Sequence, residues 1–554
     1  MLKSKEPIYY RSTHSYNDMP KNRDTKVVTL FDTIFTDAYN EMPSERVAFA
    51  EASDTDHSLT YGQLKTQVLK CAAGLKHKFG IQRGDVVAIC SPNNIEYAIL
   101  FHGIIAAGGI VAAIRSTADC TRDDIVYNIT TAKPKLFIIY QTEIDAVLPA
   151  AKEARISESN ILLLTCDSTK INLLANISTV EGTLFSSEEL AEPYRYTKDD
   201  LTNSPCCLYY TSGSTGKNKA VMIRQSSLIH YLLHGPLDVG TLNSLIIAKF
   251  SYASGLFIYS TFGLFSRWTS YLLKSNEPAL EHVLEAIERL KINITMMTPF
   301  MATKLVKRLN LSKNYDVSSL SQVIVGGAYV DKSIIQSAKE ELGLHFINTY
   351  GMTEILLVFR ASVDQSIAGT VGRLVNGVLG RIVDDDGNDL PPGSEGELRI
   401  KGPTTTLGYY NQPEATTELF DEQGYLKTGD IFKADESGLL YYVTRKKDLI
   451  KYYGIHIFPA EIEEVIIGHP QVTDCAVIGV FSKEEGTELP RAYVSLLDKV
   501  NDKESLLKEI AEYADSQLPD SKKLRGGIFE VSSFPRTGTG KIQCFKLQNV
   551  SGAE

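Results

Sequence analysis

The stretch that decides the fold reads Leu208-Tyr209-Tyr210-Thr211-Ser212-Gly213-Ser214-Thr215-Gly216-Lys217-Asn218-Lys219. Its first residues are apolar or aromatic, and hydroxyl groups, glycines and lysines follow them. Glycines let backbone N–H groups approach phosphate oxygens, hydroxyls add neutral donors, and lysines neutralise charge. The stretch therefore predicts a loop that binds a triphosphate, although a flexible Ser/Gly surface loop would have the same composition.

The spacing of the two glycines argues against the most familiar nucleotide-binding motifs. A Walker A loop has four residues between its glycines, whereas only Ser214 and Thr215 separate Gly213 from Gly216. No GxGxxG follows a strand-like run near the N-terminus either, which removes the main support for a dinucleotide-binding fold.

On either side of this stretch, apolar β-branched runs alternate with helical patterns. Residues 86–90, 135–140 and 161–165 read as strands, and helix-like segments separate them. From Leu280 onward a helical stripe is followed by a strand-like run at 292–297. This alternation predicts βαβ units and a parallel sheet, so the expected fold class is α/β.

The texture of the sequence changes at about residue 370. Short β-rich segments with turns such as Pro391-Pro392-Gly393 continue to about 445 and predict a small antiparallel sheet or barrel. The basic cluster Arg445-Lys446-Lys447-Asp448 follows, and the rest of the chain reads as a compact α+β unit. A chain of 554 residues is too long for one core. We therefore predict a large domain at 1–446 and a small domain at 447–554.

Composition narrows the possible partners and compartment. The formal net charge is −10 with both signs interspersed, which argues against nucleic acid as a partner. No apolar run is long enough for a membrane span, the N-terminus is polar, and the last residues carry no peroxisomal signal. The eight cysteines form no CxxC pair. We expect a soluble cytoplasmic protein, and these data do not predict its oligomeric state.

Five segments, taken in order, resemble the ANL superfamily of adenylate-forming enzymes: acyl- and aryl-CoA synthetases, nonribosomal peptide adenylation domains and firefly luciferase. The first is 210–219, and the others are Asn348-Thr349-Tyr350-Gly351-Met352-Thr353-Glu354, Gly424-Tyr425-Leu426-Lys427-Thr428-Gly429-Asp430, Arg445-Lys446-Lys447-Asp448-Leu449-Ile450-Lys451 and Pro535-Arg536-Thr537-Gly538-Thr539-Gly540-Lys541. The similarity extends from about Leu59 to Lys541. It is closest to the 4-coumarate-CoA ligase and luciferase branch, through 451–454 and 459–463.

The resemblance implies a fold and an activity. The fold is a large N-terminal domain of βαβ sheets with a small β-barrel-like subdomain, and a small mobile α+β C-terminal domain. The activity is ATP-dependent conversion of a carboxylic acid to an acyl- or aryl-AMP, followed by transfer to coenzyme A, with Mg²⁺ as cofactor. A carboxylate is already an anionic nucleophile at neutral pH, so catalysis needs cations and oriented donors rather than a base.

The resemblance also implies the nucleotide site. Thr353 would meet the α-phosphate, Glu354 would hold Mg²⁺, and Tyr350 would stack on adenine, with a simple core position as the alternative for Tyr350. Asp430 would accept hydrogen bonds from the ribose hydroxyls. The remaining candidate nucleotide ligands are Thr211, Ser212, Gly213, Ser214, Thr215, Gly216, Lys219, Gly326, Gly327, Ala328, Asn348, Gly351, Met352 and Arg445.

The C-terminal part would supply mobile catalytic groups. Lys541 ends a Gly-rich loop, and its cation would move between the substrate carboxylate and the α-phosphate. Lys447 corresponds to the hinge about which the C-terminal domain turns. Lys451, Gly454 and His456 would belong to the face that is presented in one of its two poses. His456 replaces the glutamine of the nearest branch, which would make that step sensitive to pH.

The acid pocket is expected near 250–255, with Tyr252, Ser254 and Gly255 as its candidate residues. Tyr252 occupies the place where amino acid activating domains carry an aspartate, which argues against amino acid substrates. The apolar residues beside it favour an aryl or medium acyl acid. Leu256, Phe257 and Phe262 would make the pocket apolar or could be ordinary core.

Three alternatives remain open. Because the sequence ends shortly after Lys541 with no carrier domain, coenzyme A is the first choice of acceptor. A separate carrier protein, or oxygen as in luciferases, is the second. The third is a non-catalytic nucleotide-binding homologue, suggested by departures from the family pattern at Asn218, Ala220, Thr444 and His456.

Overall fold

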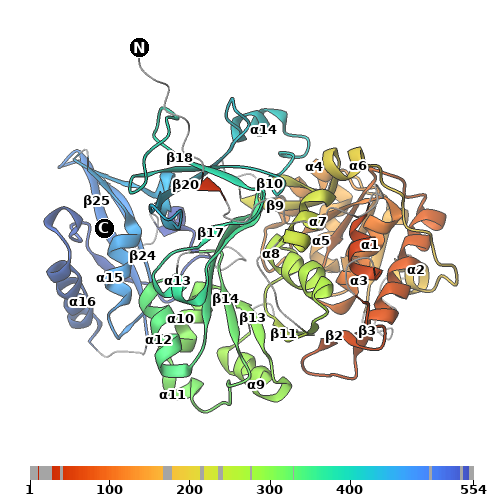
Figure 1. The fold of residues 1–554 in the computed structure, drawn as a ribbon, viewed down its shortest axis with the longest axis horizontal. Helices are drawn as coiled ribbons and strands as arrows, with labels where there is room; N and C mark the ends of the chain where they lie inside the picture. Colours follow the sequence, from red (N-terminus) through yellow and green to blue (C-terminus); the bar gives the residue numbers. More distant parts are fainter. Residues whose placement is uncertain are drawn as a thin grey trace.

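The computed structural model describes residues 10–11, 28–37, 41–165, 177–212, 218–234, 241–274, 278–328, 330–453, 455–497, 502–536 and 541–547. Helices α1 to α6 lie at one end of the molecule, the elements after residue 450 lie at the other, and the green middle segment lies between them (Figure 1). The predicted α/β fold class, with a large sheet-containing N-terminal part and a small C-terminal part, is confirmed.

The first sheet has seven strands in the order β10-β9-β5-β4-β6-β7-β8. The predicted strands at 86–90, 135–140 and 161–165 all belong to it and run parallel. Its strands are β4 (Val86–Cys90), β5 (Ile110–Ile114), β6 (Leu136–Tyr140), β7 (Ile161–Leu164), β8 (Ser178–Thr179), β9 (Pro205–Ser212) and β10 (Asn218–Arg224). Helices α2 (Tyr61–Phe79) and α3 (Ile95–Ala107) pack against each other, α3 contacts β5, and α4 (Arg122–Ala132) packs against β10.

The second sheet has nine strands in the order β17-β16-β15-β14-β13-β11-β12-β2-β3. The predicted helix from Leu280 is α9 (Leu280–Leu290), and the strand expected at 292–297 begins two residues later, as β13. The strands are β2 (Val47–Glu51), β3 (Ser58–Thr60), β11 (Asn243–Ile246), β12 (Thr269–Leu272), β13 (Ile294–Met297), β14 (Gln322–Val325), β15 (Phe346–Met352), β16 (Leu356–Arg360) and β17 (Arg373–Leu374). Helices α10 (Pro299–Lys307) and α12 (Lys332–Leu342) connect its central strands.

A third sheet occupies the region predicted as a small antiparallel sheet or barrel. It has five antiparallel strands in the order β1-β18-β19-β20-β21, and its described strands do not pair end to end into a closed barrel. The strands are β1 (Tyr10–Arg11), β18 (Leu379–Val383), β19 (Glu395–Lys401), β20 (Leu426–Ala434) and β21 (Leu440–Arg445). The turn residues between them have the conformations that the sequence suggests, since Gly387 and Gly438 have φ of 84° and 81°.

The C-terminal part has its own apolar core, which includes Ile462, Val477, Val494 and Ile510. It contains a hairpin of β22 (Ile450–Tyr452) and β23 (Ile455–Ile457), a sheet of β24 (Val472–Ser482), β25 (Thr487–Leu496) and β26 (Ile528–Glu530), and the helices α15 (Pro459–Ile467), α16 (Lys503–Gln517) and α17 (Cys544–Leu547). This separate core is what allows the C-terminal part to behave as a unit.

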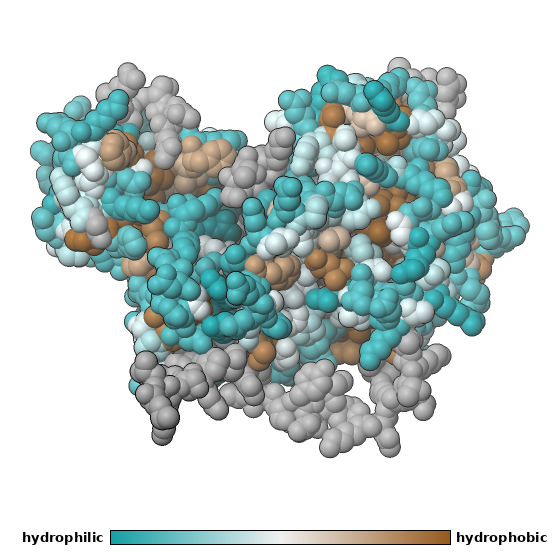
Figure 2. All heavy atoms as spheres, turned by 90° about the horizontal axis from the view of Figure 1, so that it is seen from above, coloured by the Kyte–Doolittle hydropathy of each residue, from teal (hydrophilic) through white to brown (hydrophobic). Residues whose placement is uncertain are grey.

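The surface is mostly hydrophilic on the face shown in Figure 2, where a notch separates the lobe at the left from the larger body. Apolar side chains are scattered over this face in small groups. None of the helices in the described part of the chain has both the length and the apolar character that crossing a membrane requires.

Candidate active site

A cavity of about 1250 Å³ lies where the three large sheets and the C-terminal part meet. Most of the predicted site residues line it: Thr211, Lys219, Tyr252, Ser254, Gly326, Gly327, Ala328, Asn348, Tyr350, Gly351, Met352, Thr353, Glu354, Asp430, Arg445, Lys447 and Lys541. Gly213, Ser214, Thr215 and Gly216, and the side chain of Ser212, lie outside the described residues. The structure thus brings together groups that are separated by more than three hundred positions in the sequence.

Thr353 and Glu354 lie in the tight turn between β15 and β16. The turn can close because Gly351 has no side chain, since a Cβ there would lie 2.3 Å from the carbonyl oxygen of Leu356. Both residues line the cavity at this hairpin tip. A turn between paired strands holds its side chains more rigidly than a free loop, so the two groups keep a fixed relation to the sheet.

The Glu354 carboxyl group is buried, with 5% of the residue exposed. Its Oε1 accepts a hydrogen bond of 3.1 Å from the hydroxyl of Tyr409. Burial raises the pKa of Glu354, while the charges of Arg445 and Lys219 act in the opposite direction. The Lys219 ammonium lies 4.9 Å from the centre of the Tyr409 ring. Tyr409 was not predicted, because nothing in the local sequence indicates that its hydroxyl reaches a carboxylate from another sheet.

The residues present fit a magnesium ion that is shared with a nucleotide. Mg²⁺ in such sites takes one or two protein carboxylates and completes its shell with phosphate oxygens and water. Glu354 supplies one buried carboxylate at the cavity, and its Oε1 accepts a hydrogen bond from the Tyr409 hydroxyl. Within the described ranges, no cluster of three or more His, Cys, Asp or Glu side chains could hold a metal on its own. This donor set suits an ion that arrives with a triphosphate.

Asp430 of β20 forms the centre of a hydrogen-bonded group with Arg445 of β21 and Tyr350 of β15. Its Oδ2 accepts from the Tyr350 hydroxyl at 2.7 Å, and its Oδ1 accepts from Nε of Arg445 at 2.9 Å. Strand register explains the second contact, because Asp430 and Arg445 are direct partners across the antiparallel pair. The Asp430 carboxylate raises the pKa of Arg445 above its usual value, against the effect of burial. One carboxylate therefore fixes a phenol ring and a guanidinium at the cavity wall.

The predicted adenine-facing backbone follows β14. Gly326 packs so closely on Thr349 that a Cβ would lie 2.5 Å from its hydroxyl oxygen, and Gly327 has a φ of 91°. Both positions require glycine, which leaves the backbone open to a flat ligand. Asn348 lies on the adjacent β15 and is buried.

Lys541 reaches the cavity from the C-terminal part and lies close to the Asp430 group. Burial is the largest effect on its ammonium and lowers its pKa to about 8. This net value also includes the positive charges of Arg445 and Lys447, which lower the pKa, and the carboxylates of Asp430 and Asp448, which raise it. A lysine with this pKa is still largely charged at neutral pH, and it is surrounded by the groups that were predicted to hold the ribose and phosphates.

The structure separates Lys451 and His456 from this cluster. The two residues face each other across the β22–β23 pair, and both are exposed. Neither lines the cavity in this arrangement, and Gly454 lies outside the described residues. Lys447 lies between β21 and β22 in a 3-10 turn at Lys446–Asp448, where the chain passes into the C-terminal part. The predicted roles of these residues in a second pose remain predictions.

The predicted acid pocket is partly built as expected. Tyr252, Ser254 and Phe257 line the cavity, whereas Leu256 and Phe262 are fully buried in the core. Gly255 lies behind the wall, where a Cβ would be 2.2 Å from the carbonyl oxygen of Lys249. Apolar side chains that sequence reasoning missed complete the wall: Ile247, Ile258, Met296, Met297 and Phe300.

Arg115 was also missed by sequence reasoning. It follows β5, its guanidinium carbon lies 4.8 Å from the centre of the Tyr252 ring, and it donates to the Tyr210 carbonyl oxygen. It thus connects the acid pocket to the start of the phosphate-binding stretch. The order of strands β9 and β5, which are adjacent in the sheet and far apart in the sequence, produces this contact.

The unusual Asn218 at the end of the phosphate-binding stretch has partners. Its amide nitrogen donates to Asp124 at 3.2 Å and to Asn128 at 3.3 Å, both on α4. These bonds tie β10 to the helix beside it. We infer that they take over the stiffening that a proline would give at this position.

The fold and the cavity together define a nucleotide-dependent enzyme with a large α/β part and a small C-terminal part that carries one of the groups of the site. A model of the family described as AMP-binding enzyme matches residues 35–410, and one described as AMP-binding enzyme C-terminal domain matches residues 461–541. The chain belongs to this family of AMP-binding enzymes, which confirms the superfamily predicted from the five motifs.

Two fungal relatives match over nearly their whole length. The acyl-CoA ligase azaF of Aspergillus niger is 32% identical and is aligned over 94% of this chain and 97% of its own. The phenylacetyl-CoA ligase epaB of Aspergillus niger is 31% identical over 94% and 96% of the two chains.

A solved structure shares the fold. The benzoate CoA ligase of Burkholderia xenovorans LB400 superposes with a TM-score of 0.81 at 22% identity and covers 94% of this chain and 100% of its own.

Proposed function

We propose that this chain is an AMP-forming acid–thiol ligase, which activates a carboxylic acid with ATP and transfers the acyl or aryl group to coenzyme A. The observation that carries the proposal is the convergence of Glu354, the Asp430 group and Lys541 on one cavity. A carboxylate for a metal, a buried platform for a ribose and a mobile cation for a phosphate are the parts that acid adenylation needs. The family and the curated relatives support the same activity.

In the first step, a carboxylate oxygen of the acid attacks the α-phosphorus of ATP, the new O–P bond forms, and the bond to pyrophosphate breaks. Both reactants are anionic, so the barrier is mainly electrostatic. Lys541 and Thr353 donate to the α-phosphate, and Lys219 contacts the phosphates that leave. Magnesium, held by Glu354, would neutralise charge on the triphosphate. Asp430, Tyr350 and Arg445 hold the nucleoside, so the α-phosphate is presented in one orientation.

In the second step, the thiol loses its proton, its sulfur attacks the acyl carbon, and AMP leaves with the bonding electron pair. Because Lys451 and His456 are exposed in the present arrangement, we assign them to a different orientation of the C-terminal part that turns at Lys447. A carrier protein with a similar thiol arm is the second candidate acceptor. The amide bond synthetase McbA of Marinactinospora thermotolerans, with a TM-score of 0.76 and 25% identity, motivates an amine as a further acceptor to test.

The substrate that fits the wall best is an aryl or arylalkyl acid. Tyr252, Phe257 and Met296 offer flat and polarizable surfaces, and no described aspartate lines this wall between 247 and 258 to bind an α-ammonium group. The phenylacetyl-CoA ligase relative, at 31% identity, supports an aromatic acid.

A library of carboxylic acids, assayed for AMP release with and without coenzyme A, tests the proposal. Product release that depends on the thiol, with an acyl-CoA detected by mass spectrometry, is the expected result. An adenylate that accumulates equally with and without coenzyme A would transfer the assignment to another acceptor. Complete silence with aryl, acyl and amino acids, from a protein that still binds ATP, would leave the non-catalytic alternative.

A further inference from the structure

Lys307 connects the two parts of the molecule by an unusual contact. It is the last residue of α10 in the large part, yet its ammonium donates to carbonyl oxygens of the small part. The acceptors are Ile467 at 2.6 Å, His469 at 3.2 Å and also Val472. An ammonium has three N–H donors, so this arrangement uses all of them.

The three acceptors are available because of where they lie. Ile467 is the last residue of α15, and the carbonyls at the end of a helix have no partner within the helix. They also carry the negative end of the helix dipole, which favours a cation. Val472 begins β24. One ammonium therefore ties together the end of a helix and the beginning of a strand in the C-terminal part.

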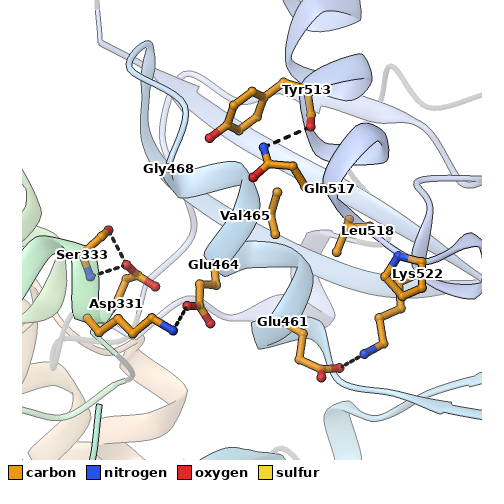
Figure 3. A pocket seen from close by; sticks show the side chains of 12 residues that line it. Asp331, Ser333, Glu461, Glu464, Val465, Gly468, Tyr513, Gln517, Leu518 and Lys522 are labelled. Carbon is orange, nitrogen blue, oxygen red and sulfur yellow. Dashed lines mark hydrogen bonds and ion pairs between the residues drawn. The ribbon is translucent and has the colours of Figure 1, made fainter. Parts of the chain in front are cut away.

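The neighbouring contacts between the parts are more exposed. Glu464 of α15 pairs with Lys332 of α12 at 2.9 Å, with 35% and 59% of the two side chains exposed (Figure 3). Asp331 and Ser333, at the start of α12, lie across a cleft of about 440 Å³ from Glu461 and Glu464 (Figure 3). Exposed ion pairs contribute little to the free energy that holds two surfaces together. The half-buried Lys307 contact should therefore hold the two parts together more strongly than the Lys332–Glu464 pair does.

Contacts within the C-terminal part relate β24 to Lys541. Arg536 forms an ion pair with Asp474 of β24 and pairs as a bridge with Ile542, the neighbour of Lys541. The N–H of Gln543 also donates to the carbonyl oxygen of Pro535 at 2.7 Å. The segment that carries Lys541 is thus attached to the strand whose first residue Lys307 holds.

We propose that Lys307 is a positioning residue for the adenylation step. By holding α15 and β24 against α10, it keeps the C-terminal part in the orientation that puts Lys541 in the cavity. Lys307 does not line the cavity, so it acts on the reaction only through this orientation. The effect on activity rests on the proposed function, whereas the effect on orientation does not.

The orientation can be measured without any substrate. A carbodiimide joins a lysine to a carboxylate only when they are in contact, so the yield of a Lys332–Glu464 crosslink in the full chain, measured by mass spectrometry of peptides, reports the closed joint. The pair Lys313–Glu341, at 3.0 Å and similarly exposed, lies wholly within the large part and serves as the internal control. In Lys307→Met, which keeps most of the length of the side chain and loses the ammonium, the closing equilibrium should weaken by about tenfold.

The expected result is a clear loss of the Lys332–Glu464 crosslink in Lys307→Met with an unchanged Lys313–Glu341 yield, and partial recovery in Lys307→Arg. Unchanged yields at both pairs would overturn the proposal. If Lys307→Met does not fold, as shown by loss of the control crosslink, Lys307→Gln is measured against the same two criteria.

Activity then distinguishes this proposal from the proposed function. Pyrophosphate exchange in Lys307→Met should fall by about tenfold through kcat with the KM for ATP little changed, while Lys313→Met stays at the wild-type rate. If the wild-type protein exchanges no pyrophosphate and Lys307→Met still loses the crosslink, the proposed function is contradicted, and Lys307 remains an orienting residue. Full exchange in Lys307→Met, despite a lost crosslink, would show that the orientation does not matter to the step.

Discussion

Two regions reach the same cavity by different means. One is the wall formed by Asp430, Arg445 and Tyr350, which is distinct from the side of the acid pocket, and the other is the segment that carries Lys541. On the wall, Arg445 is the register partner of Asp430 across β20 and β21, which explains their 2.9 Å hydrogen bond, and Tyr350 of β15 donates to the same carboxylate at 2.7 Å. Lys541 instead depends on contacts between two separately packed parts. The wall should therefore tolerate changes in the C-terminal part, whereas Lys541 should be sensitive to them. Binding and rate are expected to separate when each region is altered.

The largest effect is expected for Lys541→Ala. Removal of the only cation that the C-terminal segment 541–547 brings to the cavity should reduce pyrophosphate exchange by about 10²- to 10³-fold. The affinity for ATP, measured by calorimetry, should change little because the wall remains intact. Lys546→Ala, at an exposed position on α17, is the control and should behave as wild type. Exchange near the wild-type rate in Lys541→Ala would remove the central catalytic assignment.

A second large loss of exchange is expected for Glu354→Gln, which removes a negative charge where Lys541→Ala removes a positive one. The amide keeps the shape and can still accept from the Tyr409 hydroxyl, but it removes the charge that would hold Mg²⁺. Exchange should fall by about 10²-fold, with partial recovery at higher Mg²⁺ concentration.

Tyr409→Phe distinguishes the charge of Glu354 from its hydrogen bond to Tyr409. It removes the hydroxyl that donates to Glu354 and leaves the carboxylate in place, so its loss should be much smaller and independent of Mg²⁺. Equal losses in the two variants would mean that Glu354 acts through its hydrogen bond rather than through a metal.

These two regions also differ in what the sequence could predict. The wall was predictable because its residues lie in short motifs that resemble those of the family: Gly351 belongs to the motif 348–354, and Asp430 ends the Thr428-Gly429-Asp430 motif inside β20. Periodicity likewise predicted the strands at 86–90, 135–140 and 161–165 and the helix that begins at Leu280. The contacts of Tyr409, Arg115 and Lys307 could not be predicted, because each joins segments that only the packing of different sheets or parts brings together.

The pH dependence of the first step should report the environment of Lys541. Its pKa is lowered to about 8, chiefly by burial, so the charged form is lost as the pH rises through that value. Exchange should be near its maximum at neutral pH, fall to about half of that near pH 8, and decline by up to about tenfold per pH unit above it. Lys541→Arg, which stays charged, should be slower but should lack this alkaline limb. A wild-type profile that is flat to pH 10 would indicate that the Lys541 amine is exposed or that its charge is not required.

The smallest effect is expected for Tyr350→Phe, which removes one hydroxyl from the most preorganised part of the wall. Asp430 would lose the 2.7 Å bond from Tyr350 but keep its contact with Arg445, and the aromatic packing on Phe432 would remain. A single hydrogen bond of this kind contributes about 1 kcal/mol, so the KM for ATP should rise by about fivefold with kcat nearly unchanged. Tyr441→Phe, which loses a 3.3 Å bond to Asp435 elsewhere on the same sheet, should leave both constants unchanged. A fall in kcat without a change in KM would show that the wall acts on the reacting phosphate itself, and the distinction between a binding wall and a catalytic segment would have to be abandoned.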